Sequence, residues 1–310
     1  MNANKSNLQG VYSPVITPFH SNLNVNKELL IKQCQWLLSQ DVGLAIFGTN
    51  SEANSLSVDE KIDVLDALIE TGIDPKKTMP GTGCCALPDT IKLTQHAMKI
   101  GCKNVLMLPP FYYKNVSDEG LFDSYSKIIE SVNNDNLRIY LYHIPPIANV
   151  AITLNLIEKL KKRYPKIIAG IKDSSGDWNN TLAMLNENWP DFKIFAGSEV
   201  FLLKTLQNGG AGCISATANI NPYAISMLYK NWLNSDAIIQ QENLNKFRNI
   251  VQKYPMIPAL KSIVGHYHQD TDWHRVRPPL TSLSASNLHS LIKEIEAIGF
   301  TMTDTIQISN

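Results

Sequence analysis

Short apolar runs alternate with longer amphipathic segments along almost the whole chain, and this alternation constrains the fold more than any other feature. Eight runs read as strands because they are brief, apolar and bounded by turn-forming residues. Several are apolar throughout, as strands buried on both faces of a parallel sheet should be. The predicted strands cover residues 10–15, 43–48, 78–81, 104–108, 138–142, 167–172, 193–196 and 212–215.

Eight strand–helix units in succession predict an α/β fold, the (β/α)8 or TIM barrel. A helix after each strand returns the chain so that the next strand can lie parallel to it. Eight units within about 230 residues fit this fold, which typically needs roughly 250. An open doubly wound sheet is the alternative, but no G-x-G-x-x-G motif follows the first strand. We therefore expect a barrel.

Helix signals and a helical C-terminal segment complete the predicted organisation. Ser57 and Glu60 form a capping-box pattern, and Gly72 and Gly101 close two predicted helices. Further helical pattern follows the eighth unit, with Ser286 as the predicted N-cap of the last helix. We expect a polar N-terminal tail over residues 1–8, the barrel over residues 9–234, and a C-terminal helical extension packed on the barrel over residues 235–310.

The composition is that of an ordinary globular protein. Of the 310 residues, 44% are hydrophobic, and 28 basic residues balance 28 acidic ones. Nucleic-acid and membrane-surface partners usually require a basic excess, so neither is expected. No apolar stretch approaches the roughly 20 residues of a membrane span, and the N-terminus lacks an apolar signal core. Five irregularly spaced cysteines without a C-x-x-C pair predict reduced thiols, a cytoplasmic protein and no zinc site.

Reactive side chains stand at the predicted carboxyl ends of the strands, where barrel enzymes carry their active sites. The sixth strand ends on Lys172 and the fifth on Tyr142. A lysine in a partly apolar pocket can lose its proton and attack a ketone, and the resulting protonated imine stabilises a neighbouring carbanion. A tyrosine can move protons on and off the reacting oxygen. This chemistry needs neither metal nor organic cofactor, and we expect neither.

Each of these residues also has a structural interpretation. A lysine at a strand end often only reaches into water, and a tyrosine on a barrel wall is often a core aromatic. Thr49 follows the second strand as a turn residue would, and Glu52 is expected to be a structural carboxylate that supports the loop. The proximity of Lys172 and Tyr142 at adjacent strand ends favours catalysis for this pair. Structural roles are also expected for His143, Cys84 and Cys85.

The strand-end motifs resemble those of the pyruvate-dependent class I aldolases, the family that contains dihydrodipicolinate synthase and N-acetylneuraminate lyase. The first strand leads into "TPF", the second into "GTNSE", the fifth ends in "YHIP" and the sixth in "GIK". The resemblance runs from "YSPVITPF" to about "VRPPL" and so covers nearly the whole chain. Each motif alone is weak, but the spaced set is highly specific.

This resemblance implies catalytic roles for four residues. Lys172 would form the Schiff base, and Tyr142 would shuttle protons at the imine. Thr49 would link that tyrosine to the pyruvate carboxylate. Tyr112 would be lent to a partner subunit across a dimer interface. Tyr113 is the alternative, if the register of "PPFYYK" is shifted by one residue.

The resemblance also implies a set of substrate contacts. Asn50 occupies a carboxylate-binding position beside Thr49, and Gly197 and Ile214 fall where the pyruvate pocket is lined. The sequence around the sixth and seventh strands is similar to that of the branch of the family that acts on 4-hydroxy-2-oxoglutarate and 2-keto-3-deoxy sugar acids. The side chains that would meet hydroxyls of such an acceptor are those of Ser198, Asp173 and Ser174.

Two departures from the family pattern bear on function. Ser51 stands where the family usually has a glycine, and a positive φ there would carry a cost. Ile147 stands where dihydrodipicolinate synthases place an arginine that grips the carboxylate of the aldehyde substrate. An apolar side chain cannot replace a bidentate guanidinium, and losing such a contact typically costs roughly 1.5–3 kcal/mol. The synthase reaction is therefore disfavoured.

The expected function is reversible aldol cleavage or condensation of pyruvate with an aldehyde through an imine on Lys172. The alternatives are 4-hydroxy-tetrahydrodipicolinate synthase, a keto-deoxy sugar acid dehydratase that uses the same imine, and a non-enzymatic keto-acid binder. The substrate would be a 2-keto-3-deoxy or 4-hydroxy-2-oxo acid. The resemblance further implies a homo-oligomer, a dimer of dimers.

Overall fold

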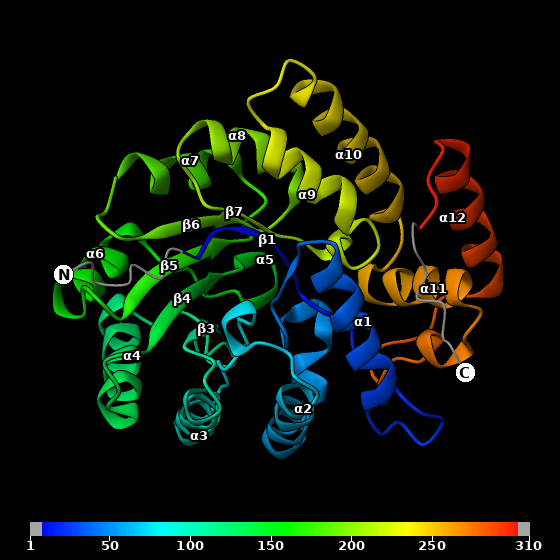
Figure 1. Cartoon of the computed structure of the whole chain (residues 1–310). Helices are drawn as coiled ribbons and strands as arrows, with labels where there is room; N and C mark the ends of the chain where they lie inside the picture. The colour runs from blue at the N-terminus through cyan, green and yellow to red at the C-terminus, as the bar shows by residue number, and fades with distance from the viewer. Residues whose placement is uncertain (1–7, 303–310) are drawn as a thin grey trace. The chain divides into compact units, whose positions relative to one another are not determined.

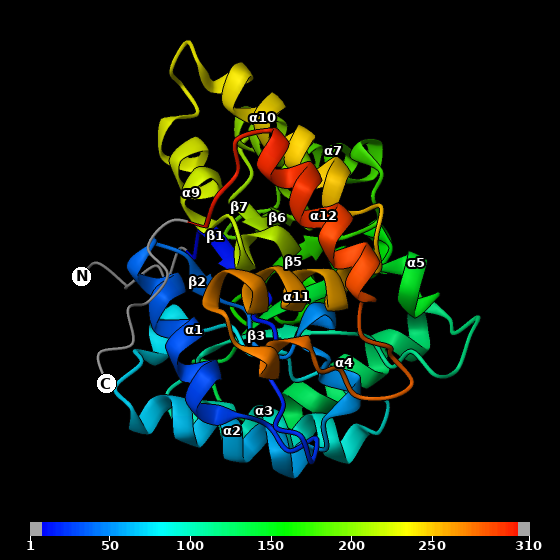
Figure 2. The ribbon, with the colours of Figure 1, turned by 90° about the vertical axis from the view of Figure 1, so that its right-hand side faces the viewer.

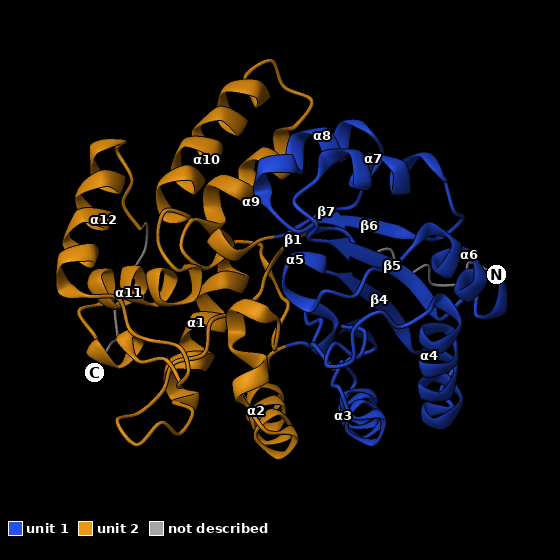
Figure 3. Cartoon of the chain, turned by 180° about the vertical axis from the view of Figure 1, so that it is seen from behind, with its two compact units in different colours: residues 1–10, 74–214 blue, residues 11–73, 215–310 orange. Residues whose placement is uncertain are grey.

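The predicted strand-end residues lie on parallel strands in the structure of the chain, which is a computed structural model. The structure describes residues 8–302, which fall into two units (Figure 3). Of these residues, unit 1 takes 8–10 and 74–214, and unit 2 takes 11–73 and 215–302.

Unit 1 contains five consecutive strands, each paired in parallel with the next, in the order β3, β4, β5, β6, β7. Most of the helices of this unit lie around the outer side of the sheet (Figure 1). The strands are β3 (Asn104–Met107), β4 (Arg138–His143), β5 (Ile168–Asp173), β6 (Lys193–Ala196) and β7 (Gly212–Ile214). The helices are α3 (Leu87–Lys99), α4 (Asp118–Val132), α5 (Pro145–Ala148), α6 (Leu154–Arg163), α7 (Trp178–Asn186) and α8 (Leu202–Gln207).

The central strands of unit 1 are buried along their whole length. Every residue of β5 is buried, and so is every residue of β4 except Arg138. Tyr140 of β4 packs edge-on against Phe195 of β6, with ring centres 5.9 Å apart. The continuous apolar runs of the sequence therefore correspond to strands covered on both faces.

The prediction of a strand at residues 78–81 is wrong. Gly81 makes a single parallel bridge to Leu106, flanked by hydrogen bonds from Leu106 N to Pro80 O (2.9 Å) and from Thr82 N to Leu106 O (3.0 Å). Pro80 has no N–H group, so the ladder cannot extend through it. The segment still follows the course of a strand beside β3.

Unit 2 contains two short strands and most of the remaining helices. Here β1 (Gly10–Ser13) pairs in parallel with β2 (Gly43–Leu44) through Tyr12 and Ser13. Figure 2 shows α10 beside α12, with α11 next to both. The helices are α1 (Lys27–Ser39), α2 (Val58–Glu70), α9 (Pro222–Asn231), α10 (Ala237–Val251), α11 (Met256–His268) and α12 (Ala285–Ala297).

Most of the local helix signals are confirmed. Ser57 Oγ accepts from Glu60 N (3.1 Å), and Glu60 Oε2 accepts from Ser57 N (2.9 Å), so the capping box is complete. Gly72 follows α2 with φ +87°. The predicted N-cap Ser286 is wrong, because Ser284 Oγ accepts from Asn287 N and α12 begins two residues earlier.

Alternation of parallel strands and helices confirms the predicted fold class, a (β/α)8 barrel with a C-terminal helical extension. Parallel pairing sets all strands of a unit in the same direction, so their carboxyl ends point to one side. The predicted reactive residues lie at these ends.

Candidate active site

Lys172 and Tyr142 lie side by side at the carboxyl ends of β5 and β4. They are register partners in the parallel ladder, so their side chains project to the same face of the sheet. The Nζ atom of Lys172 lies 4.2 Å from the centre of the Tyr142 ring. Lys172 is 2% exposed and Tyr142 is 3% exposed. Lys172 therefore does not extend into solvent, and its amine rests against the aromatic ring.

The neighbouring carboxylate of Asp173 is fully engaged elsewhere. Its Oδ2 accepts from Thr181 Oγ1 (2.6 Å) and Asn180 Nδ2 (3.0 Å), and its Oδ1 accepts from Ser175 N (2.9 Å). Asp173 thus fastens the first turn of α7 to the end of β5. Within residues 8–302, no carboxylate lies within ion-pair distance of Lys172. The carboxylate that follows Lys172 in the chain is thus committed to a structural role.

Gly197 occupies a position where only a hydrogen fits. Its N–H donates to Asp173 O (2.7 Å), and a Cβ atom at this position would lie 2.1 Å from Ser174 Oγ and 2.7 Å from Asp173 O. Such distances are far below contact, so the close approach of β5 and β6 at their carboxyl ends requires glycine. Ser198 follows, with its hydroxyl accepting from Val200 N (3.3 Å). Ile214, at the end of β7, is completely buried.

Thr49 and Asn50 belong to unit 2, where they form a single 3-10 turn, η1 (Thr49–Ser51). Both side chains are half-buried. Ser51 anchors the turn, because its Oγ accepts from Gly48 N (3.1 Å) and its carbonyl accepts from Thr17 Oγ1 (2.7 Å). The positive φ falls on Glu52 (+55°), and Ser51 keeps a helical backbone. Serine in place of glycine is therefore accommodated without strain.

Glu52 is a structural carboxylate, as expected, and its partners come from far along the chain. Its Oε1 pairs with Lys261 Nζ of α11 at 2.6 Å, and its Oε2 accepts from Arg277 N at 2.9 Å. The Glu52 and Lys261 side chains are both 0% exposed. Burial lowers the pKa of Lys261 to about 8, although the negative charge of Glu52 opposes that shift. Lys261 and Arg277 are not among the site residues predicted from the sequence.

The tyrosines predicted to reach a partner subunit lie on the surface. Tyr112 and Tyr113 are 74% and 73% exposed, and their rings pack edge to face at 5.4 Å. Lys114 ties their loop down by donating to Phe111 O and, at 3.0 Å, to Ala148 O of α5. Both tyrosines are equally available for an intermolecular contact. Ile147, in the same helix α5, is also exposed.

The residues expected to be structural show no metal-binding arrangement. His143 Nδ1 accepts from Ile152 N (3.0 Å), and burial lowers the pKa of His143, with Asp173 opposing the shift. Cys84 is half-buried, and its N–H donates to Thr90 Oγ1 (3.0 Å). Within residues 8–302 no three histidine, cysteine or acidic side chains converge as metal ligands. No helix in that range is long and apolar enough to cross a bilayer.

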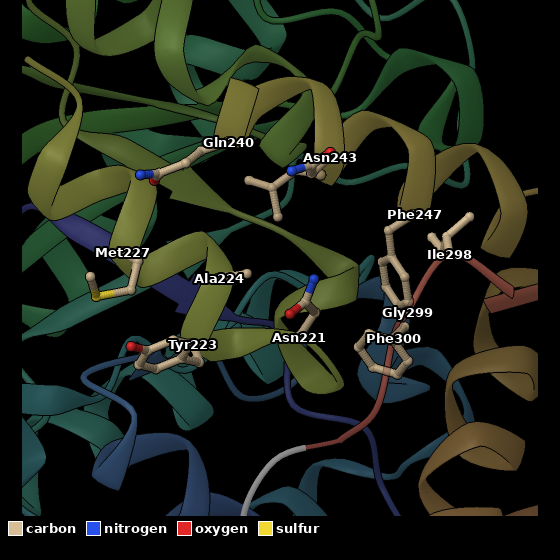
Figure 4. Close-up of a pocket in the computed structure, with 11 residues that line it drawn as sticks. Asn221, Tyr223, Ala224, Met227, Gln240, Asn243, Phe247, Ile298, Gly299 and Phe300 are labelled. Atoms are coloured by element: carbon tan, nitrogen blue, oxygen red, sulfur yellow. The ribbon is translucent and has the colours of Figure 1, made fainter. Parts of the chain in front are cut away.

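A surface pocket in unit 2 lies outside this group of residues (Figure 4). Its cavity measures about 370 Å³, and it lies between α9, α10 and the segment that follows α12. The walls are mostly apolar, with amide groups but no lysine and no acidic side chain. None of the predicted site residues lines it. The lining residues are Asn221, Tyr223, Ala224, Met227, Gln240, Asn243, Leu244, Phe247, Ile298, Gly299 and Phe300.

Known proteins match the chain over nearly its full length. An uncharacterized DapA-like lyase of Chloroflexus aurantiacus is 31% identical over 293 residues, which cover 94% of this chain and 97% of that protein. The structure of dihydrodipicolinate synthase from Agrobacterium tumefaciens superposes with a TM-score of 0.86 at 30% identity, covering 93% of this chain and 99% of that one.

A second solved structure is a prophage protein of the dihydrodipicolinic acid synthase family from Escherichia coli K12, in complex with pyruvate. It superposes with a TM-score of 0.85 at 25% identity and covers 94% of this chain and 99% of its own. The model of the dihydrodipicolinate synthetase family matches residues 7–298. The family predicted from the strand-end motifs is thus confirmed, and the chain belongs to the dihydrodipicolinate synthetase family.

Proposed function

We propose that the protein is a class I carbon–carbon lyase that acts through an imine on Lys172. It would join pyruvate to an aldehyde by aldol condensation, or release pyruvate from the product by the reverse cleavage. The observation that carries this proposal is the buried amine of Lys172 against the ring of Tyr142, without a carboxylate among the described residues to neutralise it. A structural lysine of this burial would be expected to have such a partner, as Lys261 does.

The proposed reaction begins when the neutral Lys172 amine attacks the ketone carbon of pyruvate. A carbinolamine forms, and loss of water leaves a protonated imine. The imine withdraws electrons from the neighbouring methyl carbon, which loses a proton to give an enamine. The enamine carbon then bonds to the carbonyl carbon of the aldehyde, whose C=O bond opens to a hydroxyl as its oxygen takes up a proton. Water hydrolyses the new imine, which frees the product and the Lys172 amine. Cleavage follows the same steps in reverse.

Tyr142 would carry protons in these steps. Its ring lies against Lys172 Nζ, so its hydroxyl is near the atoms that become carbinolamine and imine. Thr49 is proposed to link Tyr142 to the pyruvate carboxylate, and Asn50 to bind that carboxylate. Gly197 and Ile214 are proposed to line the pyruvate pocket. The pyruvate complex of the E. coli family member supports pyruvate as the donor. No metal or organic cofactor is required by this sequence of steps.

The proposed acceptor is the aldehyde half of a 2-keto-3-deoxy acid or a 4-hydroxy-2-oxo acid. Ile147, 60% exposed in α5, offers no cation to an acceptor carboxylate. Asp173 is already bound to α7, which leaves Ser198 and Ser174 as the hydroxyl contacts among the expected residues. Two alternative activities are proposed beside this one. The first is that of dihydrodipicolinate synthase, the name given to the similar Agrobacterium protein. The second is dehydration of a keto-deoxy sugar acid through the same imine on Lys172.

We also propose a cytoplasmic homo-oligomer, a dimer of dimers, without nucleic-acid or membrane partners. All five cysteines are free thiols, which suits a reducing compartment. The zero net charge sets no electrostatic barrier to association. The exposed pair Tyr112 and Tyr113 would be buried by such an assembly.

A product assay tests the function. The purified protein is incubated with a panel of 2-keto-3-deoxy and 4-hydroxy-2-oxo acids, and separately with pyruvate and aspartate semialdehyde. Release of free pyruvate supports the lyase, a dehydrated keto acid without pyruvate supports the dehydratase, and a cyclised condensation product supports the synthase. If none of the mixtures yields a product, an enzymatic role is contradicted. Lys172→Ala should abolish turnover, Lys172→Arg should not restore it, and the exposed control Lys166→Ala should retain it.

A further inference from the structure

Glu52 directly follows the turn that carries Thr49 and Asn50. Its N–H donates to Thr49 O (3.1 Å), which closes the turn, and its own backbone is left-handed with φ +55°. A left-handed conformation is costly for a residue with a side chain, so the surroundings must hold it in place. The position of Glu52 therefore fixes where the turn ends.

Each carboxylate oxygen of Glu52 has one donor, and both donors come from the C-terminal part of unit 2. Lys261 Nζ lies 2.6 Å from Oε1, and Arg277 N lies 2.9 Å from Oε2. Lys261 Nζ also lies 4.4 Å from the centre of the Phe19 ring, and the Arg277 guanidinium lies 4.8 Å from it. The carboxylate is thus held by two donors, and the side chains of both donor residues lie against the Phe19 ring.

A buried ion pair of this kind is a poor source of stability. Removing two charges from water is costly, and replacing such pairs with packed apolar residues is often neutral or stabilising. The lowered pKa of Lys261 reflects that cost. What the pair supplies is a fixed geometry, because a charged hydrogen bond at 2.6 Å allows Glu52 little freedom.

We infer that Glu52 and Lys261 are positioning residues for substrate binding: the pair holds the Thr49–Asn50 turn in the geometry that receives the pyruvate carboxylate. This inference rests on the proposed function, since it takes Thr49 and Asn50 as carboxylate contacts. Lys172 belongs to unit 1, whereas Glu52 and Lys261 belong to unit 2. Loss of the pair should therefore weaken pyruvate binding and leave the reactivity of the Lys172 amine at saturation intact.

Pyruvate-dependent trapping separates these two effects. The rate at which borohydride fixes pyruvate to Lys172 is measured against pyruvate concentration for the wild type, Glu52→Gln and Lys261→Met. Each variant should raise the half-saturating pyruvate concentration about tenfold or more, because one partner of a buried charge pair is lost. The maximal rate should stay within about threefold, since no group at Lys172 changes.

The control is Lys253→Met, which removes an exposed lysine paired with Glu294 in the same part of the chain. It should leave the half-saturating concentration unchanged. Should Lys261→Met fail to fold, the double variant Glu52→Gln/Lys261→Met removes both buried charges and is measured instead, with the same expected rise.

An unchanged half-saturating concentration in folded variants would overturn the positioning role, and so would an equal rise in Lys253→Met. A wild type that fixes no pyruvate at Lys172 would instead contradict the proposed function itself. The two failures are therefore distinguished by the wild-type measurement alone.

Discussion

Tyr142 and Lys172 face each other across neighbouring parallel strands, with the lysine Nζ 4.2 Å from the centre of the tyrosine ring. This contact is made to the face of the ring. Packing against Lys172 and proton transfer at the imine are therefore separable, because phenylalanine retains the first and removes the second.

Tyr142→Phe should lower turnover about 10²- to 10⁴-fold, the usual contribution of a positioned general acid–base group. Pyruvate binding should persist, because the ring still packs beside Lys172. Steady-state kinetics of the reaction identified in the substrate panel measure the loss. Tyr140→Phe, two residues earlier on β4, is the control and should retain activity. Equal turnover in wild type and Tyr142→Phe would remove Tyr142 from the chemistry.

Gly197→Ala should destabilise the protein, because its Cβ would lie 2.1 Å from Ser174 Oγ and 2.7 Å from a backbone oxygen. Overpacking of this kind typically costs about 1–3 kcal/mol. Gly120→Ala in α4 is the matched control, since its nearest neighbour is 3.6 Å away, and it should stabilise the helix by about 0.5–1 kcal/mol. Urea unfolding of both variants checks this. Unchanged stability of Gly197→Ala would show that β5 and β6 can separate there at no cost.

Glu60 should make the protein sensitive to acid. Its hydrogen bonds from the Arg277 guanidinium lower the pKa of Glu60 from 4.5 to about 2. Between these values the unfolded chain binds the proton first, so stability should fall as pH drops from 4.5 towards 2. The Glu60 side chain is 35% exposed, and solvent screening should limit the effect to roughly 1 kcal/mol.

Free energies of unfolding at pH 7 and at about pH 3 test this prediction for Glu60→Gln. The variant should be less stable than wild type at pH 7, and the difference should shrink at the lower pH. Glu70→Gln, an exposed position at the end of the same helix, is the control and should follow the wild type. If the difference in free energy of unfolding between Glu60→Gln and wild type is the same at both pH values, the lowered pKa of Glu60 is contradicted.

Tyr112 or Tyr113 should complete the site of a partner subunit if the proposed dimer forms. Inactive Lys172→Ala protomers are mixed with inactive Tyr112→Phe protomers and, separately, with Tyr113→Phe. A mixed dimer with a shared site regenerates one site that has both residues intact, so activity should return. Continued inactivity in verified mixed dimers would place the tyrosine in its own subunit's site.

Much of this fold follows from local sequence. Brief apolar runs mark β3 to β7, and the capping box of Ser57 and Glu60 marks the start of α2. The local patterns mislead where a single hydrogen-bonding group decides the outcome. Pro80 removes a ladder donor from the segment beside β3, and Ser284 rather than Ser286 accepts the hydrogen bond that begins α12.

The proximity of Lys172 and Tyr142 also follows from sequence, because both residues end neighbouring parallel strands. The partners of Glu52 do not, since Lys261 lies 209 residues away. A buried lysine inside a helix gives no signal in the pattern, and periodicity alone marks it as a surface residue. Tertiary contacts of this length require the structure.

The central claim is the imine on Lys172, and borohydride reduction in the presence of pyruvate followed by peptide mass mapping tests it most directly. Reduction converts the imine to a stable secondary amine that carries the pyruvate carbons. The peptide that contains Lys172 should gain the mass of this adduct, and Lys172→Ala should gain none. An adduct on a different lysine, or none in protein that turns over substrate, would contradict the account.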